Sequence, residues 1–311
     1  MKSKNLANIQ LYPSDNFKIA IDNLTRKAFE LCIDGGEKLT AEITESRAKN
    51  IKSAITISNL EKLKIKFDEF HWAVFDACLS EIRAGNEYTT LAVLRRKLGG
   101  TANKKYLKDE NSKKNSPVNL NLDTDIKNAI EELAMVRIVV DMEDTKKFYD
   151  SPTKSGIYKF NGYILPSESL EMSVNGQDAT LYHFTSKSIL FATSEMKDQV
   201  ITCDNELFQP PVRMTRRTVA INHFLLRRIL EMKGNAEISK TNKRVIPLRH
   251  TILTDTLYRA CGLDNANKRT KQEARQTAEK FLNYFGEQKL IKGYSIETDR
   301  GGKARAINIE L

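Results

Sequence analysis

Apolar positions recur at helical spacing in two parts of the chain, and both parts follow one order of elements. In the first part, Asp68 is a favourable helix N-cap, and the apolar stripe from Val74 to Ile82 ends at Gly85. The elements expected there are a helix after residue 68, a strand at 87–90, a helix at 91–98 and a helix from about residue 123. Strands are expected to follow at 137–141, 156–165, 170–174 and 179–184. The last two of these strands are joined by an Asn175-Gly176 turn.

The C-terminal third repeats this order. The elements expected there are an amphipathic helix at 217–232 ended by Gly234, a strand at 245–248, a helix at 251–261, a long helix from about Lys268 to Leu290, and strands at 292–297 and 304–311. A helix, a short strand, two helices and a β-hairpin are the order of a winged helix, a helix-turn-helix variant in which the hairpin forms the wing. The sequence therefore predicts an α+β fold with two winged-helix domains.

Two further segments complete the predicted organisation. Apolar residues from Ile189 to Leu207 keep helical spacing until Pro210-Pro211, which indicates a long connector helix. Near the N-terminus, a helix at 17–32 and short strands at 55–57 and 63–67 are expected. The predicted divisions are an N-terminal extension (1–60), a first winged-helix domain with an elaborated wing (61–185), the connector helix (186–211) and a second winged-helix domain (212–311).

The excess of positive charge is confined to the second of these domains. The chain holds 50 Lys and Arg against 40 Asp and Glu, a formal net charge of +10. Residues 213–311 hold 21 Lys and Arg and 10 Asp and Glu. The remaining residues hold 29 Lys and Arg and 30 Asp and Glu, so their net charge is close to zero. A basic domain beside a neutral one favours a polyanionic partner held by one module, and a generic solubilising surface is the alternative.

The long helix of the second domain carries the residues best suited to DNA. Its apolar positions fix one face to the core, and cations and a glutamine lie at its start. In helix-turn-helix proteins these N-terminal residues reach base edges, where Arg and Lys bind guanine and Gln binds adenine. Cations on the hairpin suit phosphates or the minor groove. The predicted DNA-binding residues are Lys268, Arg269, Lys271, Gln272, Arg275, Arg300, Lys303 and Arg305; a plain solvated face is the alternative.

The matching helix of the first domain is acidic. It opens with Asp123 and Asp125 and continues with Glu131 and Glu132, so its surface repels phosphates. We expect this domain to make protein contacts, including those of a homodimer. A Lys-rich loop before the helix is expected to give secondary DNA contact through Lys104, Lys105 and Lys108, although a solvated loop explains it equally well.

The sequence offers no convincing catalytic or metal site. Leu248-Arg-His-Thr251 followed by Tyr284 resembles a box of tyrosine recombinases, but Ile246 stands where that box has a His. The four His and four Cys are scattered without zinc spacing, and no Walker A loop is present. We therefore expect a non-enzymatic protein without metal or cofactor. Because no apolar run has the length of a membrane span or the character of a signal peptide, a cytoplasmic location without membrane contact is expected.

Two winged-helix units joined by a long helix resemble the iteron-binding replication initiator proteins of plasmids. Short stretches also resemble initiator-like proteins of Gram-positive mobile elements, namely Phe67-Asp-Glu-Phe70, Gly85-Asn-Glu-Tyr-Thr-Thr90, Leu98-Gly-Gly100, Phe224-Leu-Leu-Arg-Arg-Ile229 and Ile291-Lys-Gly-Tyr294. The resemblance covers residues 60–311 in layout. It implies a protein that binds double-stranded DNA repeats at an origin, helps to open the duplex and recruits the host replicative helicase.

The resemblance also implies that the C-terminal unit is the main base reader and that dimers repress their own promoter. A transcriptional regulator of a mobile element uses the same DNA contacts, so that function stays open. A protein whose winged units bind only other proteins is a third alternative, which a salt titration of DNA binding separates from the first two.

Overall fold

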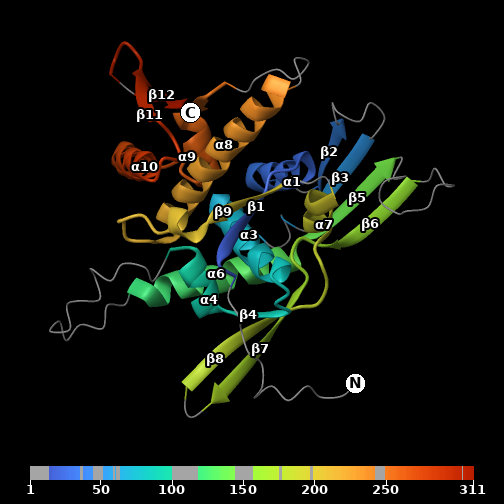
Figure 1. Cartoon of the computed structure of the whole chain (residues 1–311). Helices are drawn as coiled ribbons and strands as arrows, with labels where there is room; N and C mark the ends of the chain where they lie inside the picture. The colour runs from blue at the N-terminus through green and yellow to red at the C-terminus, as the bar shows by residue number, and fades with distance from the viewer. Residues whose placement is uncertain are drawn as a thin grey trace, which may run out of the picture.

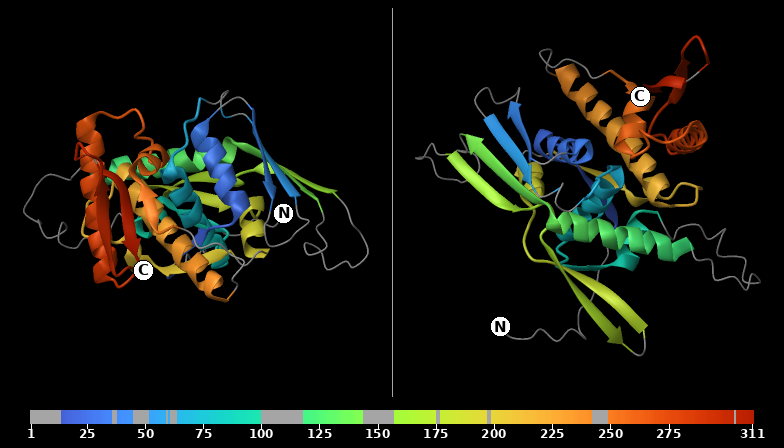
Figure 2. Two further views of the ribbon diagram at one scale, coloured as in Figure 1. Left: turned by 90° about the horizontal axis from the view of Figure 1, so that it is seen from above. Right: turned by 180° about the vertical axis from the view of Figure 1, so that it is seen from behind.

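The computed structural model describes residues 14–35, 38–44, 52–58, 60, 64–99, 118–143, 157–174, 177–196, 199–241, 249–302 and 304–311, which form an α+β fold (Figure 1). Most of the helices lie together, and strand pairs project away from them in different directions (Figure 2). Within these ranges, no helix is long and apolar enough to cross a membrane.

The first unit has the order of elements that the sequence predicts. It consists of α3 (Glu69–Arg83), β4 (Tyr88–Thr90), α4 (Leu91–Lys97), α6 (Val118–Met135), β7 (Ser167–Val174) and β8 (Gln177–Phe184). The Asp68 carboxylate accepts the Phe70 amide hydrogen and the His71 ring accepts that of Asp68, so a capping box starts α3. α6 begins at Val118, before the expected Asp123. β8 lies between β4 and β7 in an antiparallel sheet.

A second antiparallel sheet combines two strands that precede α3 with two strands that lie between α6 and β7. Its strands follow the order β2 (Lys38–Thr44), β3 (Lys52–Ser58), β5 (Arg137–Glu143) and β6 (Ile157–Tyr163). β3 pairs with β5, placing Ile57 opposite Ile138. This pairing joins residues of the expected N-terminal extension to the first unit. It also separates β5 and β6 from the hairpin β7–β8, whose Asn175-Gly176 turn lies outside the described residues.

The helix expected at residues 17–32 is a strand followed by a shorter helix. β1 (Asn16–Ala20) precedes α1 (Asn23–Asp34), and the Asp22 side chain caps α1 by accepting the amide hydrogens of Leu24 and Thr25. The expectation was wrong over 17–20 because β1 finds a distant partner, β9 (Val200–Asp204). Residues 64–67 of the strand expected at 63–67 are likewise not in a strand.

The long connector helix expected at 186–211 is not one helix. The segment forms α7 (Ile189–Met196), β9 and the short 3-10 helix η2 (Asn205–Phe208). Antiparallel pairing with β1 holds residues 200–204 extended, and Phe208 stacks on Phe17 with ring centroids 3.9 Å apart. Apolar spacing alone could not distinguish this arrangement from a helix, because the partner strand lies some 180 residues away.

The second unit repeats the order and the strand pairing of the first. It consists of α8 (Arg216–Thr241), β10 (Thr251–Leu253), α9 (Thr254–Ala260), α10 (Lys268–Glu287), β11 (Gly293–Thr298) and β12 (Ala304–Glu310). Here β12 lies between β10 and β11, as β8 lies between β4 and β7. The two units therefore share one topology.

Two boundaries of the second unit differ from the prediction. α8 continues past Gly234 to Thr241, because a glycine inside a helix costs only about 1 kcal/mol and does not by itself end it. Residues 251–253, expected to open a helix, form β10 because they pair with β12. The strand expected at 245–248 lies outside the described residues.

The first helices of the two units pack against each other. α3 contacts α8, and the buried side chains of both units form one continuous core. Phe70 and Phe75 of α3 and Phe224 and Leu225 of α8 are essentially inaccessible to solvent. The two units are therefore parts of one packed body.

Candidate nucleic-acid interface

α10 is fixed to the protein by one face, as the sequence predicts. Its buried residues are Ala274, Ala278, Phe281, Leu282 and Phe285. The Asn267 side chain caps the helix by accepting the Thr270 amide hydrogen at 2.9 Å. Because the apolar face is locked in the core, the opposite face is held open to solvent in a defined orientation.

The middle of the open face carries one cation and two amides. Arg269, Gln272 and Gln276 are exposed, with 89% of the Arg269 side chain accessible. At 3.6 residues per turn these three side chains lie near the centre of the face, and exposed Lys268 lies beside them. Gln276 was missing from the predicted site, although its position one turn after Gln272 could have revealed it.

Lys271 and Arg275 also have partners within the protein, as Arg269 has in Glu273. Lys271 donates its ammonium to the Asp264 carbonyl oxygen at 2.6 Å, and it lies 5.7 Å from the centre of the Tyr258 ring. The Arg275 Nε lies 3.2 Å from a Glu279 carboxylate oxygen, and the side chain is 30% exposed. At 3.6 residues per turn Arg275 lies toward the edge of the open face, whereas Lys271 lies on the side of α10 that carries the buried residues, so neither is placed for bases.

The hairpin β11–β12 lies beside α10 and adds charge to the same surface (Figure 1). The Tyr294 hydroxyl donates a hydrogen bond to Asn283 of α10 at 3.0 Å. At the tip, the Asp299 carboxylate accepts the Gly301 amide hydrogen, and Gly302 has a φ of +76°. Arg300 and Arg305 are exposed as predicted, whereas Lys303 lies outside the described residues.

The carboxylates of α6 are largely engaged by protein partners. Asp123 pairs with Arg95 at 2.5 Å and Glu132 pairs with the His71 ring at 2.5 Å. Burial raises the pKa of Asp123, and the charge of Arg95 opposes that shift. α6 therefore presents few cations to a polyanion. Lys104, Lys105 and Lys108, predicted as secondary DNA contacts, lie outside the described residues.

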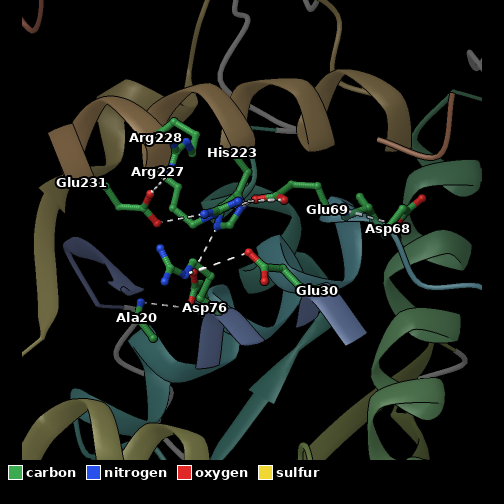
Figure 3. Close-up of polar contacts among 11 residues, drawn as sticks. Ala20, Glu30, Asp68, Glu69, Asp76, His223, Arg227, Arg228 and Glu231 are labelled. Atoms are coloured by element: carbon green, nitrogen blue, oxygen red, sulfur yellow. Dashed lines mark hydrogen bonds and ion pairs between the residues drawn. The ribbon is translucent and has the colours of Figure 1, made fainter. Parts of the chain in front are cut away.

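A buried ion network connects the two units where α3 meets α8 (Figure 3). The Arg227 guanidinium binds both Glu69 carboxylate oxygens at 2.9 and 3.1 Å and also binds Glu231 at 2.9 Å. The His223 ring lies between Glu69 at 2.8 Å and Asp76 at 3.0 Å. No pattern in the sequence indicates this network, because Glu69 and Arg227 are 158 residues apart.

The network shifts the pKa values of its members. Burial lowers the pKa of His223, but its hydrogen bonds to Asp76 and Glu69 outweigh this effect and raise it above the ordinary 6.5. Burial raises the pKa of Asp76 to about 6. Burial also opposes ionisation of Glu69, yet Arg227 and His223 hold its pKa below the ordinary value. His223 is therefore favoured as a cation between two carboxylates.

The titratable side chains of the network are engaged with one another. Glu69, Asp76 and His223 are 0% exposed, and each His223 ring nitrogen already has a carboxylate partner. The tyrosine considered as a recombinase nucleophile is engaged as well, since the Tyr284 hydroxyl donates to the Glu206 carbonyl oxygen at 2.6 Å. Burial raises the pKa of Tyr284, which disfavours the phenolate.

The cysteines have the environment of apolar core residues. All four are unpaired and buried, and burial raises the pKa of each thiol. Among the described residues, no group of three or more His, Cys, Asp or Glu side chains is arranged to hold a metal ion.

The chain is similar in fold to crystal structures of domains 2 and 3 of RctB. A selenomethionine derivative matches 89% of this chain and 91% of the other at 12% identity, with a TM-score of 0.37. A second structure of these domains matches 89% and 92% at 12% identity, with a TM-score of 0.35. No protein-family model and no curated protein sequence matches the chain. The function proposed below therefore rests on the residues of this chain.

Proposed function

We propose that this chain binds double-stranded DNA sequence-specifically through its second unit, with α10 in the major groove and the hairpin β11–β12 as a wing on the backbone. The observation that carries the proposal is the exposed line of Arg269, Gln272 and Gln276 on a helix whose other face is locked in the core. Arg and Gln are the side chains that read guanine and adenine in that groove. The exposed Arg300 and Arg305 supply charge beside it.

Both units are proposed to be winged helices. The support is their common order of elements and the central position of the last strand of each hairpin in a three-stranded sheet. Among the described residues, α10 of the second unit has an open cationic and amide face, whereas α6 of the first unit carries Asp123, Asp125, Glu131 and Glu132. The first unit, with the acidic α6, is proposed to make protein contacts, including those of a homodimer.

The biological role proposed is initiation of replication at repeats in the origin of a plasmid or mobile element. This role rests on the resemblance in layout to plasmid initiators and includes recruitment of a host replicative helicase. The protein is proposed to act in the cytoplasm without catalysis, metal or cofactor. A transcriptional regulator of a mobile element is the alternative.

Selection of bound sequences from random duplex DNA tests both parts of this proposal. A single enriched site confirms sequence-specific binding, and its arrangement separates the two roles. Tandem direct repeats of the site beside the gene support an initiator, whereas an inverted repeat at a promoter supports a regulator. Supercoiled DNA carrying the repeats should also become sensitive to single-strand nucleases only if the protein opens the duplex.

Salt dependence tests the DNA proposal independently of sequence. If about six phosphates are contacted, the logarithm of the binding constant should fall with the logarithm of salt concentration with a slope of about −5. A binding constant that does not change with salt would overturn the proposal and favour a protein partner.

A further inference from the structure

The first turn of α8 and the loop before it lie against the side of α10 that is away from the wing. The Arg217 guanidinium is 3.5 Å from a carboxylate oxygen of Glu273 on α10. The Tyr284 hydroxyl, on the same side of α10, contacts η2 through the Glu206 carbonyl. The wing instead reaches α10 through Tyr294 and Asn283. In Figure 1 the start of α8 lies between α10 and α6.

The three arginines of this segment have different surroundings. Arg216 binds the Asp68 carboxylate at 3.0 and 3.1 Å and stacks 4.9 Å from the Phe70 ring, so its role is in the fold. Arg217 is 39% exposed and Arg213 is exposed. The segment therefore offers two guanidinium groups to solvent, that of Arg217 against Glu273 of α10 and that of Arg213 four residues earlier in the loop before α8.

Glu273 positions two cations on the side of α10 that is away from the wing, which is called the flank here. Its carboxylate lies 3.2 Å from Arg269 Nε and 3.5 Å from Arg217 Nη2. One carboxylate shared between two guanidinium groups leaves a net positive charge, and it orients both groups. This arrangement ties Arg269, a cation of the base-facing line, to Arg217, a cation in the first turn of α8.

The dimensions of DNA give this flank a specific role. An α-helix about 10–12 Å across fills a major groove about 12 Å wide, so a phosphate backbone runs along each side of the inserted helix. The wing supplies cations on only one of these sides. The other backbone would pass beside Arg213 and Arg217.

We propose that Arg213 and Arg217 bind phosphates of the DNA strand that runs along α10 opposite the wing. This inference rests on the proposed DNA-binding function and extends it to the loop that joins the two units. Because phosphate contacts carry no sequence information, the two arginines contribute affinity and orientation, not base preference.

The test is a salt titration of duplex binding by the full chain with Arg213→Ala and Arg217→Ala. The control variant is Lys159→Ala, which removes a more exposed cation, 66% against 39% for Arg217, from β6, a strand away from α10. Each arginine variant should reduce the steepness of the salt dependence by about 0.9. That change corresponds to an affinity loss of about fivefold at 0.15 M salt, equal for selected and unrelated duplexes. Arg217→Lys should retain most of the salt dependence, because it keeps the charge.

The outcomes separate this inference from the broader proposal. If the unchanged protein shows no salt-dependent DNA binding, the proposed function fails. If it binds but both alanine variants, still folded by circular dichroism, match Lys159→Ala in affinity and slope, only the flank assignment is wrong. A loss restricted to the selected sequence would also overturn it, because that pattern indicates base contacts.

Discussion

At the scale of single residues, the residues on the open face of α10 are not all those that the sequence predicts for the site. Lys268, Arg269 and Gln272 were predicted and are exposed. Arg275 was also predicted, but Glu279 holds it at the edge of the face. Residue type and helical spacing predicted which face of α10 is open to solvent. They could not show which cations are paired, because pairing depends on side-chain positions in three dimensions.

The two glutamines should carry sequence preference. Gln272→Ala and Gln276→Ala should each weaken binding to the selected site by about 1–3 kcal/mol, because an amide that bridges adenine N6 and N7 is lost. Binding to unrelated duplexes should hardly change. Gln288→Ala, at an exposed position just beyond α10, is the matched control. Equal losses on all sequences would show that the glutamines do not face bases.

Replacing His223 by glutamine should destabilise the protein most near and below pH 6.5. The folded-state pKa of His223 is raised, so its stabilising effect is fully present below the unfolded value of 6.5 and is lost as pH rises through the folded value. Breaking a buried ion pair costs about 3–5 kcal/mol. The difference in free energy of unfolding between the wild type and His223→Gln should therefore shrink between pH 6.5 and 9.

Urea unfolding across that pH range measures the effect. His183→Gln is the control, since the His183 side chain is 36% exposed and belongs to the outer hairpin. It should change the free energy of unfolding by less than about 1 kcal/mol. A His223→Gln deficit that stays constant from pH 6.5 to 9 would show that His223 is not charged in the folded protein.

At the scale of elements, local signals predicted those elements that depend on nearby residues. The Asp68 cap, the apolar stripe of α10 and the final hairpin all depend on neighbours along the chain, and all are present. β1 and β9 were missed because each is extended only through its pairing with the other. The connector helix failed for the same reason, since apolar spacing cannot report a partner strand that is distant in sequence.

Substitution of Gly99 tests the contact between the first unit and η2, the segment that follows β9. Gly99 has a φ of +83°, and a Cβ there would lie 1.9 Å from the Phe208 carbonyl oxygen of η2. Gly85 has a similar φ of +87° but open space around it. Alanine at either position should cost about 1–3 kcal/mol from backbone strain. Gly99→Ala should cost more than Gly85→Ala in urea unfolding, because η2 must also move; equal costs would contradict this contact.

At the scale of the whole molecule, the two units were predicted as modules on a connector and are instead packed together. The predicted order of elements occurs twice, so the repetition was visible in the sequence. The packing of α3 on α8 was not visible in the sequence. The residues of a buried helix face or a buried ion network follow the same pattern whether their partners lie in the same unit or in the other one. As a consequence, α10, the helix proposed to face DNA, is anchored through α8 to the first unit.

This shared core predicts that both units unfold in one transition. Separate modules commonly unfold separately, but a continuous core with buried charges across the contact couples them. Trp72, the single tryptophan, lies in α3 with its ring 3.8 Å from the Arg227 guanidinium, so its fluorescence reports the contact between units. Its unfolding curve in urea should coincide with that of far-ultraviolet circular dichroism, which reports all helices.

Arg227→Met sharpens this prediction. Removing the guanidinium leaves Glu69 and Glu231 buried without their shared cation, which should lower the free energy of unfolding by about 3–5 kcal/mol. Because the core is shared, both probes should shift to lower urea together, and salt-dependent DNA binding by α10 should be lost at the same urea concentration. A variant whose fluorescence changes while circular dichroism and DNA binding keep their wild-type midpoints would show that the units are only loosely joined.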